Sequence, residues 1–311
     1  MAANNGSQHL KGDSSLNLGY GWWTKTLDIP LHSEVSEATN LIHTALPLFP
    51  NLANLTIQGW VQAEGDKYEG IANAIQTYTP KLQYLGCRQV EQRRAVAGSV
   101  FFQIPSLRAL RTCWGRTVSE QSSTQFKRDK LTSLSLIFDG ESDIPIHIAN
   151  TLPSLTSLYL RWPLIEQTHT IQLVEAIGER LLELGLTLGL GDGYDAPVSI
   201  VEILLGYCPN LRRLLWGRSS SYQPAPFMML SSRQFPSVEL LGVSSPWRTL
   251  TKIDWEQCYP LSRFPNLKTI RLVDVLESRL PVIGNEEVSF DAVQDVPLGI
   301  VVENALGNVI A

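Results

Sequence analysis

The chain has 311 residues, of which 44% are hydrophobic and 18% are charged, and this composition excludes charge-driven disorder for most of its length. Its 25 basic and 30 acidic residues give a formal charge of −5, which argues against broad electrostatic binding to nucleic acid. Four cysteines, none of them in a C-x-x-C pair, exclude a disulfide framework and a zinc site of that spacing. Residues 1–20 contain no apolar leader and no run reaches the ~18 apolar residues of a membrane span, so we expect a soluble protein of the cytoplasm or nucleus.

One spacing recurs along the chain: an apolar residue, then a leucine three positions later, then another apolar residue two positions further on. Successive copies begin 24 to 30 residues apart, and the first copy is weaker than the others. Each copy fits a short strand that buries alternate side chains, so the period predicts stacked repeats. The copies open at Thr24, Leu52, Leu82, Leu107, Leu131, Leu155, Leu181, Leu211, Val238 and Leu267.

A proline precedes the opening position by two residues in most of these copies. Proline lacks a backbone donor and disfavours helix in the residue before it, so it marks the point where one element ends and the next strand approaches. The residue before the proline is apolar, with Thr79 as the exception. The prolines are Pro50, Pro80, Pro105, Pro153, Pro209, Pro236 and Pro265.

Several segments between the strands carry apolar residues at helical spacing. This spacing predicts helices at 35–46, 71–78, 144–152, 171–181 and 198–208. The other connections, 88–104, 112–130 and 217–235, lack periodicity and are expected to be loops or short 3₁₀ turns. One strand and one crossover per unit predict an α/β solenoid, a curved parallel sheet with helices on its convex face, because a single unit buries too little to fold alone.

The L-x-x-L-x-L pattern resembles that of the leucine-rich-repeat family and extends over residues 24–275. The asparagine that this family usually carries three residues after the last apolar strand position is absent here, as is typical of the irregular, helix-backed subclass. The segment 208–214 (CPNLRRL) is similar to repeats of F-box/leucine-rich-repeat proteins, especially the divergent fungal ones. The segment 21–25 (GWWTK) is similar to sequence found where their repeat domain starts.

In that family an N-terminal F-box docks onto the Skp1-type adaptor of a cullin ubiquitin ligase, and the repeats select the substrate. The resemblance therefore implies a non-catalytic recognition scaffold that binds a protein partner on its concave strand face. Residues 1–20 show no apolar periodicity, so adaptor binding is expected only if an F-box lies upstream. We expect a disordered segment at 1–20, about ten irregular repeats at 21–275, and a C-terminal cap or tail at 276–311.

Outward side chains of each strand lie one residue before, one after and three after the central leucine. Arginine dominates the charged residues at these positions, and its planar fork suits carboxylate or phosphate, which favours an acidic or phosphorylated protein segment as the ligand. Scattered arginines equally keep an open sheet soluble, so a structural or vestigial repeat fragment without a ligand is the alternative. The predicted partner-binding residues are Arg88, Arg111, Arg161, Arg213, Arg271, Tyr84 and Tyr159.

Motifs for catalysis and cofactor binding are incomplete. The glycine-rich segment 189–193 (GLGDG) has Tyr194 where a dinucleotide fingerprint needs its third glycine. The acidic segment 139–143 begins like a calcium loop but has Ile144 at the glycine position. The five histidines lack metal-ligand spacing, and the four cysteines are expected to be buried core residues. We therefore expect no enzymatic activity, no cofactor and no metal.

Overall fold

A computed structural model describes residues 23–30, 35–58, 65–88, 98–114, 128–138, 151–163, 167–189, 198–218, 233–243, 261–272, 299–303 and 309. The chain divides into two compact units. Unit 1 comprises residues 1–143 and 150–154, and unit 2 comprises residues 144–149 and 155–311. The expected disordered segment 1–20 and the predicted helix at 144–152, apart from its last two residues, lie outside the described residues.

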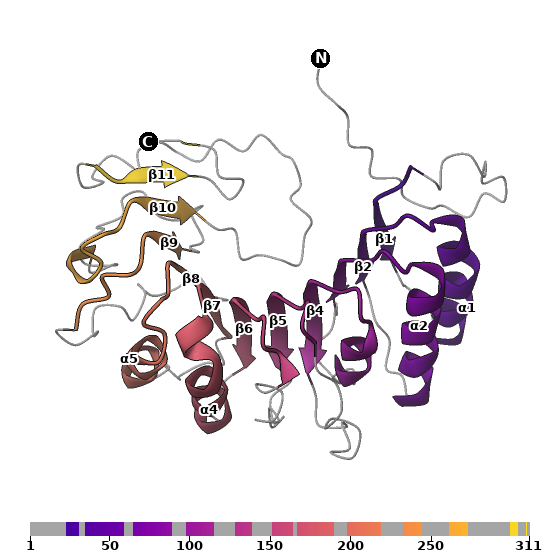
Figure 1. Ribbon diagram of the computed structural model, residues 1–311, viewed down its shortest axis with the longest axis horizontal. Helices are drawn as coiled ribbons and strands as arrows, with labels where there is room; N and C mark the ends of the chain where they lie inside the picture. Colours follow the sequence, from indigo (N-terminus) through magenta and orange to yellow (C-terminus); the bar gives the residue numbers. More distant parts are fainter. Residues whose placement is uncertain are drawn as a thin grey trace. The chain divides into compact units, whose positions relative to one another are not determined.

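Unit 1 holds strands that pair in parallel, each with the next one along the sequence. The helices between them lie together on one side of these strands (Figure 1). Its predicted strands and its two predicted helices before residue 100 are present, and the 88–104 connection contains a 3₁₀ turn as expected. The elements are β1 (Thr26–Pro30), α1 (Val35–Ala45), η1 (Leu46–Leu48), β2 (Asn54–Gln58), α2 (Gly65–Tyr78), β3 (Tyr84–Arg88), η2 (Gly98–Gln103), β4 (Ala109–Trp114) and β5 (Ser133–Phe138).

Unit 2 repeats this arrangement with parallel strands in sequence order and with α4 packed against α5. Its predicted strands and its predicted helices at 171–181 and 198–208 are present, and a further strand, β11, pairs with β10 from within the expected C-terminal cap. The elements are β6 (Ser157–Pro163), α4 (Gln167–Ile177), η4 (Gly178–Arg180), β7 (Glu183–Gly189), α5 (Val198–Gly206), β8 (Arg213–Arg218), β9 (Leu240–Val243), η7 (Leu261–Arg263), β10 (Thr269–Leu272) and β11 (Val301–Glu303).

Register explains why the leucine period produces this fold. In each unit the central apolar residue of one strand pairs with the central residue of the next, and each of them is at most 6% exposed. Burying one such side chain contributes roughly 1.5–3 kcal/mol. The α/β leucine-rich-repeat solenoid predicted from the sequence is therefore confirmed. The row is Leu27, Leu55, Leu85, Leu110 and Leu134 in unit 1, and Leu158, Leu184, Leu214, Leu241, Ile270 and Val302 in unit 2.

The prolines that precede most of the strands lie in tight turns. In the second repeat, the backbone N–H of Leu52 donates to the carbonyl of Phe49 at 3.1 Å, which places Pro50 at the second position of a four-residue turn. Proline suits that position because its ring presets φ. The same bond closes the turns that start at Arg128 and Gly178, which contain no proline. Proline thus pre-organises a turn that the repeat forms in any case.

Thr79 shows how one repeat tolerates a polar residue at the apolar position before its proline. The side chain is fully buried, and its hydroxyl donates to the carbonyl of Ile75 at 2.6 Å. A buried hydroxyl that keeps a hydrogen-bond partner avoids most of its desolvation cost. The exception seen in the sequence is therefore compatible with the core.

Neighbouring repeats are joined before the strands begin. The carbonyl of Leu182, for example, accepts from the N–H groups of both Arg212 and Arg213, at 2.9 and 3.0 Å. Asparagine side chains add a second link, because Asn210 donates to the carbonyl of Glu179 at 2.6 Å and an equivalent asparagine follows two repeats later. These asparagines therefore connect the turns that precede neighbouring strands.

Candidate partner-binding site

Register brings three of the predicted partner-binding residues onto one strand face of unit 2. Tyr159, Arg213 and Arg271 all occupy positions that alternate with the buried leucines. One row of this face runs Ser157, Glu183, Arg213, Leu240, Thr269 and Val301. The adjacent row runs Tyr159, Gly185, Leu215, Gly242, Arg271 and Glu303, and the two rows together are called the unit 2 face below.

Tyr159 is held in place from two sides. A Cβ atom on Gly185, its register partner, would lie 2.4 Å from Cδ1 of Tyr159, so the ring covers the space that glycine leaves open. The hydroxyl of Tyr159 hydrogen-bonds to the carboxylate of Glu183. Burial raises the pKa of Tyr159 above its ordinary value, and Glu183 raises the pKa further because a carboxylate opposes a second negative charge. The tyrosine is therefore a fixed, neutral part of the face.

The carboxylate of Glu183 accepts hydrogen bonds from two hydroxyl groups. In addition to Tyr159, the hydroxyl of Ser157 donates to Oε2 of Glu183 at 3.3 Å. Arg213 is the register partner of Glu183 on the next strand, yet the structure gives Arg213 no ion pair with a described residue. Arg213 is exposed, so its guanidinium is presented to solvent at the centre of the face.

Arg271 differs from Arg213 because its guanidinium already forms an ion pair with a carboxylate of the same chain. Nε and Nη2 of Arg271 lie 3.0 and 2.7 Å from Oε2 of Glu303. The two side chains are 34% and 18% exposed. Glu303 lies on β11, and the sequence reasoning missed it because the last strand was not assigned within the C-terminal cap. The only available signal was the apolar run 300–302, which places Glu303 on the outward phase.

Apolar contact area borders Arg213. Leu215 and Leu240 are half-buried neighbours of Arg213, one two residues along the same strand and one at its register position on β9. A half-buried apolar side chain beside an exposed guanidinium is typical of the contact residues in protein interfaces. The unit 2 face thus combines a charged anchor, apolar area and a fixed aromatic ring.

In unit 1 the structure places two further predicted residues. Tyr84 lies over Gly86 of its own strand, since a Cβ on that glycine would be 2.7 Å from the tyrosine hydroxyl. Arg111 is half-buried and is the register partner of Gly86 on β4. The side chains of Arg88 and Arg161 lie outside the described part of the chain. The seven predicted residues are therefore divided between two units, and their role stays a prediction.

The described residues contain no group of three or more His, Cys, Asp or Glu side chains that could hold a metal ion. None of the described helices is both long enough and apolar enough to cross a bilayer. Cys87 and Cys208 are buried free thiols, as predicted, and burial raises the pKa of Cys208 to about 12. The side chains of the other two cysteines, the segment 139–143 and nearly all of 189–193 lie outside the described residues.

Comparison with known proteins gives likenesses in structure alone. No protein-family model matches the chain, and no curated protein matches it. A structure of the Rad7 and Elc1 complex in yeast is similar with a TM-score of 0.41 and 12% identity, over 89% of this chain and 73% of that one. A structure of a TLR13–ssRNA13 complex is similar with a TM-score of 0.31 and 14% identity, over 83% of this chain. The chain spans 46% of that second protein.

Proposed function

We propose that this chain is a non-catalytic scaffold that recognises a protein partner on its outward strand face. The observation that carries the proposal is the exposed Arg213, which has apolar neighbours in Leu215 and Leu240 and lies on the same face as the fixed ring of Tyr159. Arginine and tyrosine are the residue types that most often dominate binding energy at protein interfaces. The solenoid fold supplies the rigid surface on which they are arranged.

The partner chemistry that we propose is an acidic or phosphorylated segment. The Arg271–Glu303 contact shows how a carboxylate fits an arginine on this face, with one oxygen accepting from two guanidinium nitrogens at 3.0 and 2.7 Å. Arg213 offers the same donors to a carboxylate or phosphate of a partner. Arg271 contributes less than the sequence suggested, because Glu303 already neutralises it.

The resemblance of the repeats to F-box/leucine-rich-repeat proteins extends the proposal to substrate selection for a cullin ubiquitin ligase. That step would need an F-box to bind the Skp1-type adaptor, and we confine it to a form of the protein that carries one. We propose the cytoplasm or nucleus as its compartment, which the free buried thiols of Cys87 and Cys208 support.

Charge reversal on the face tests the proposal. The variant Arg213→Glu, and the triple variant that also reverses Arg111 and Arg161, should lose a partner that the parent chain captures in stoichiometric amount. Lys130→Glu is the matched control for Arg213→Glu, because Lys130 is exposed on the turn before β5 and its substitution changes the net charge by the same amount. Circular-dichroism melts should stay unchanged. If the triple variant still captured the partner, recognition by the strand face would be refuted. If the parent chain captured no partner in stoichiometric amount, the result would favour the alternative that the chain is a structural or vestigial repeat fragment.

A further inference from the structure

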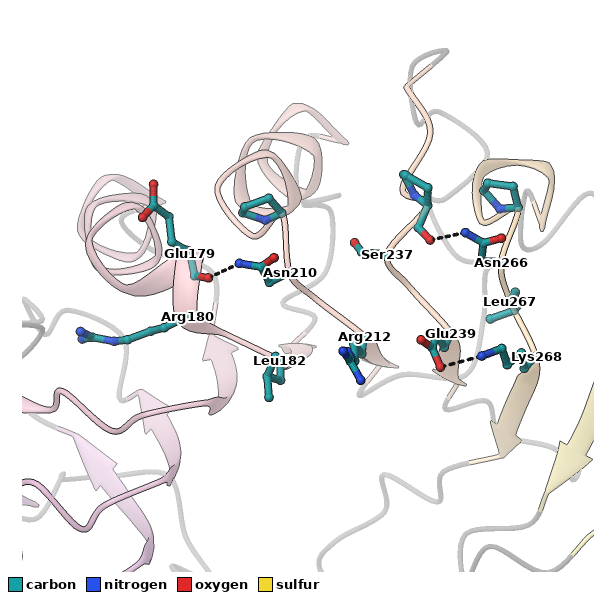
Figure 2. Close-up of a pocket in the computed structure, with 13 residues that line it drawn as sticks. Glu179, Arg180, Leu182, Asn210, Arg212, Ser237, Glu239, Asn266, Leu267 and Lys268 are labelled. Atoms are coloured by element: carbon teal, nitrogen blue, oxygen red, sulfur yellow. Dashed lines mark hydrogen bonds and ion pairs between the residues drawn. The ribbon is translucent and has the colours of Figure 1, made fainter.

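Unit 2 contains a groove away from the strand face. It has a volume of about 870 Å³ and follows the turns that precede β7, β8, β9 and β10 (Figure 2). Four successive repeats contribute equivalent turn positions to its walls. Because the strands pair in register, these turn positions form parallel rows along the edge of the sheet.

The groove is already formed in the free chain. Asn210 donates to the carbonyl of Glu179 at 2.6 Å, and Asn266 donates to the carbonyl of Pro236 at 2.8 Å, so adjacent turns are tied to one another (Figure 2). The turns themselves are closed by backbone bonds such as that from Leu211 to the Cys208 carbonyl at 3.2 Å. A preformed groove loses little conformational entropy when a ligand binds.

The charged residues that line the groove are Glu179, Arg180, Glu239, Lys268 and Arg212. Arg212 lies between the repeats of Leu182 and Glu239, to which its backbone is hydrogen-bonded. Its side chain is exposed and has no ion pair among the described residues. Glu239 lies on the next repeat and is engaged by Lys268, whose Nζ is 3.0 Å from Oε2 of Glu239 (Figure 2). Lys268 lowers the pKa of Glu239, and Arg212 lowers it to a smaller extent. Glu239 therefore stays ionised and bound to Lys268, and Arg212 keeps an open position for another anion.

Apolar surface lies next to Arg212 along the groove. Leu182 occupies the equivalent position in the preceding repeat and is 43% exposed. The exposed rings of Pro209, Pro236 and Pro265 continue this apolar surface along the row of turns. An exposed leucine beside an unengaged guanidinium is complementary to a ligand that carries both an apolar and an acidic side chain.

We propose that this groove binds an extended acidic peptide segment, with a carboxylate on Arg212 and an apolar side chain on Leu182. Leu182 and Arg212 lie on neighbouring repeats, which are about 4.8 Å apart. Residues of an extended chain that point to the same side are about 6.6 Å apart, so the two peptide side chains that contact them would be two positions apart. A peptide fits better than nucleic acid because the described residues that line the groove include no aromatic side chain to stack a base. This site is independent of the unit 2 face and of the partner proposed for it.

Fluorescence anisotropy on the full chain tests the groove. The probe is a fluorescein-labelled peptide in which Glu and Leu alternate at every second position between serines. We expect saturable binding that weakens as salt is added, and a loss of about tenfold or more in affinity for Arg212→Glu, which corresponds to about 1.4 kcal/mol. Arg212→Lys should keep part of the affinity because it keeps the charge.

Lys130→Glu is the control, because Lys130 is exposed outside both the groove and the unit 2 face and the substitution makes the same charge change. It should bind the peptide as the parent does. Equal binding of a peptide with Lys in place of Glu would overturn the proposal. Loss of affinity in Arg213→Glu with no loss in Arg212→Glu would overturn the groove and would assign the peptide to the unit 2 face instead. Tighter, Arg212-dependent binding of a single-stranded RNA oligonucleotide would also overturn it. Unchanged melts for these variants show that the comparison is between folded proteins.

Discussion

Tyr159 and Glu183 are joined across neighbouring strands of unit 2 by a hydrogen bond from the tyrosine hydroxyl to the carboxylate. This contact has two consequences. It helps to fix the tyrosine ring over Gly185, and it engages the carboxylate of Glu183, the register partner of Arg213 on the following strand. Arg213 has no ion pair with a described residue, whereas Arg271 is paired with Glu303, so the two equivalent arginines of the face differ.

The raised pKa of Tyr159 predicts weaker folding at alkaline pH. An unfolded tyrosine loses its proton near pH 10, whereas folded Tyr159 keeps it. The unfolded state therefore binds fewer protons, and the free energy of unfolding should fall above about pH 10, by up to about 1.4 kcal/mol per pH unit from this group.

Urea unfolding of the parent and of Tyr159→Phe across this pH range measures the effect. The phenylalanine variant should lose less stability as the pH rises, whereas Tyr207→Phe, which removes a hydroxyl elsewhere in unit 2, should follow the parent. Parallel curves for the parent and Tyr159→Phe would show that burial and Glu183 do not raise the pKa of Tyr159 in the folded protein.

Replacing glycine by alanine should have opposite effects on stability at two positions, Gly178 and Gly70. A Cβ on Gly178 would lie 2.3 Å from the carbonyl oxygen of Tyr207, so Gly178→Ala forces the η4 turn away from the end of α5 and should cost about 1–3 kcal/mol. A Cβ on Gly70 would meet nothing within 4 Å. Since Gly70 lies inside α2, Gly70→Ala should stabilise the protein by about 0.5–1 kcal/mol. Thermal unfolding measures both, and a neutral Gly178→Ala would mean that the two segments are not in contact.

The Arg271–Glu303 pair predicts a measurable coupling between β10 and β11. The side chains are partly exposed, so the coupling should be modest, about 1 kcal/mol, and should decrease in high salt. A double-mutant cycle with Arg271→Ala and Glu303→Ala, followed by urea unfolding, isolates it. Strictly additive losses would contradict the ion pair and would leave Arg271 open to a partner.

The sequence predicted the repeat fold well because the spacing of the leucines determines which residues of neighbouring strands pair with one another. Central residues such as Leu55 and Leu184 pair with the central residues of the adjacent strands, as their spacing requires. The turn at Arg128 shows what the proline pattern missed, since this turn forms without proline. Turn geometry is imposed by the neighbouring repeats as well as by local sequence.

The candidate site was harder to predict, because charge pairing across strands depends on side chains far apart in the sequence. Arg213 and Arg271 occupy equivalent outward positions, and nothing local distinguishes them. Glu303 engages only one of them, and it does so from β11, a strand of three residues outside the leucine pattern. The groove beside Arg212 has no sequence motif, because it arises from turns that become parallel only when the repeats stack.

Site-specific photocrosslinking tests the partner-binding role most directly. A photoreactive phenylalanine analogue in place of Leu215 would lie on the unit 2 face, and the same analogue in place of Glu175 would lie exposed on α4. We predict that the Leu215 position yields a discrete adduct with one protein, and that Arg213→Glu abolishes this adduct. Adducts from the Glu175 position alone, or adducts at Leu215 that persist in Arg213→Glu, would contradict recognition by the strand face.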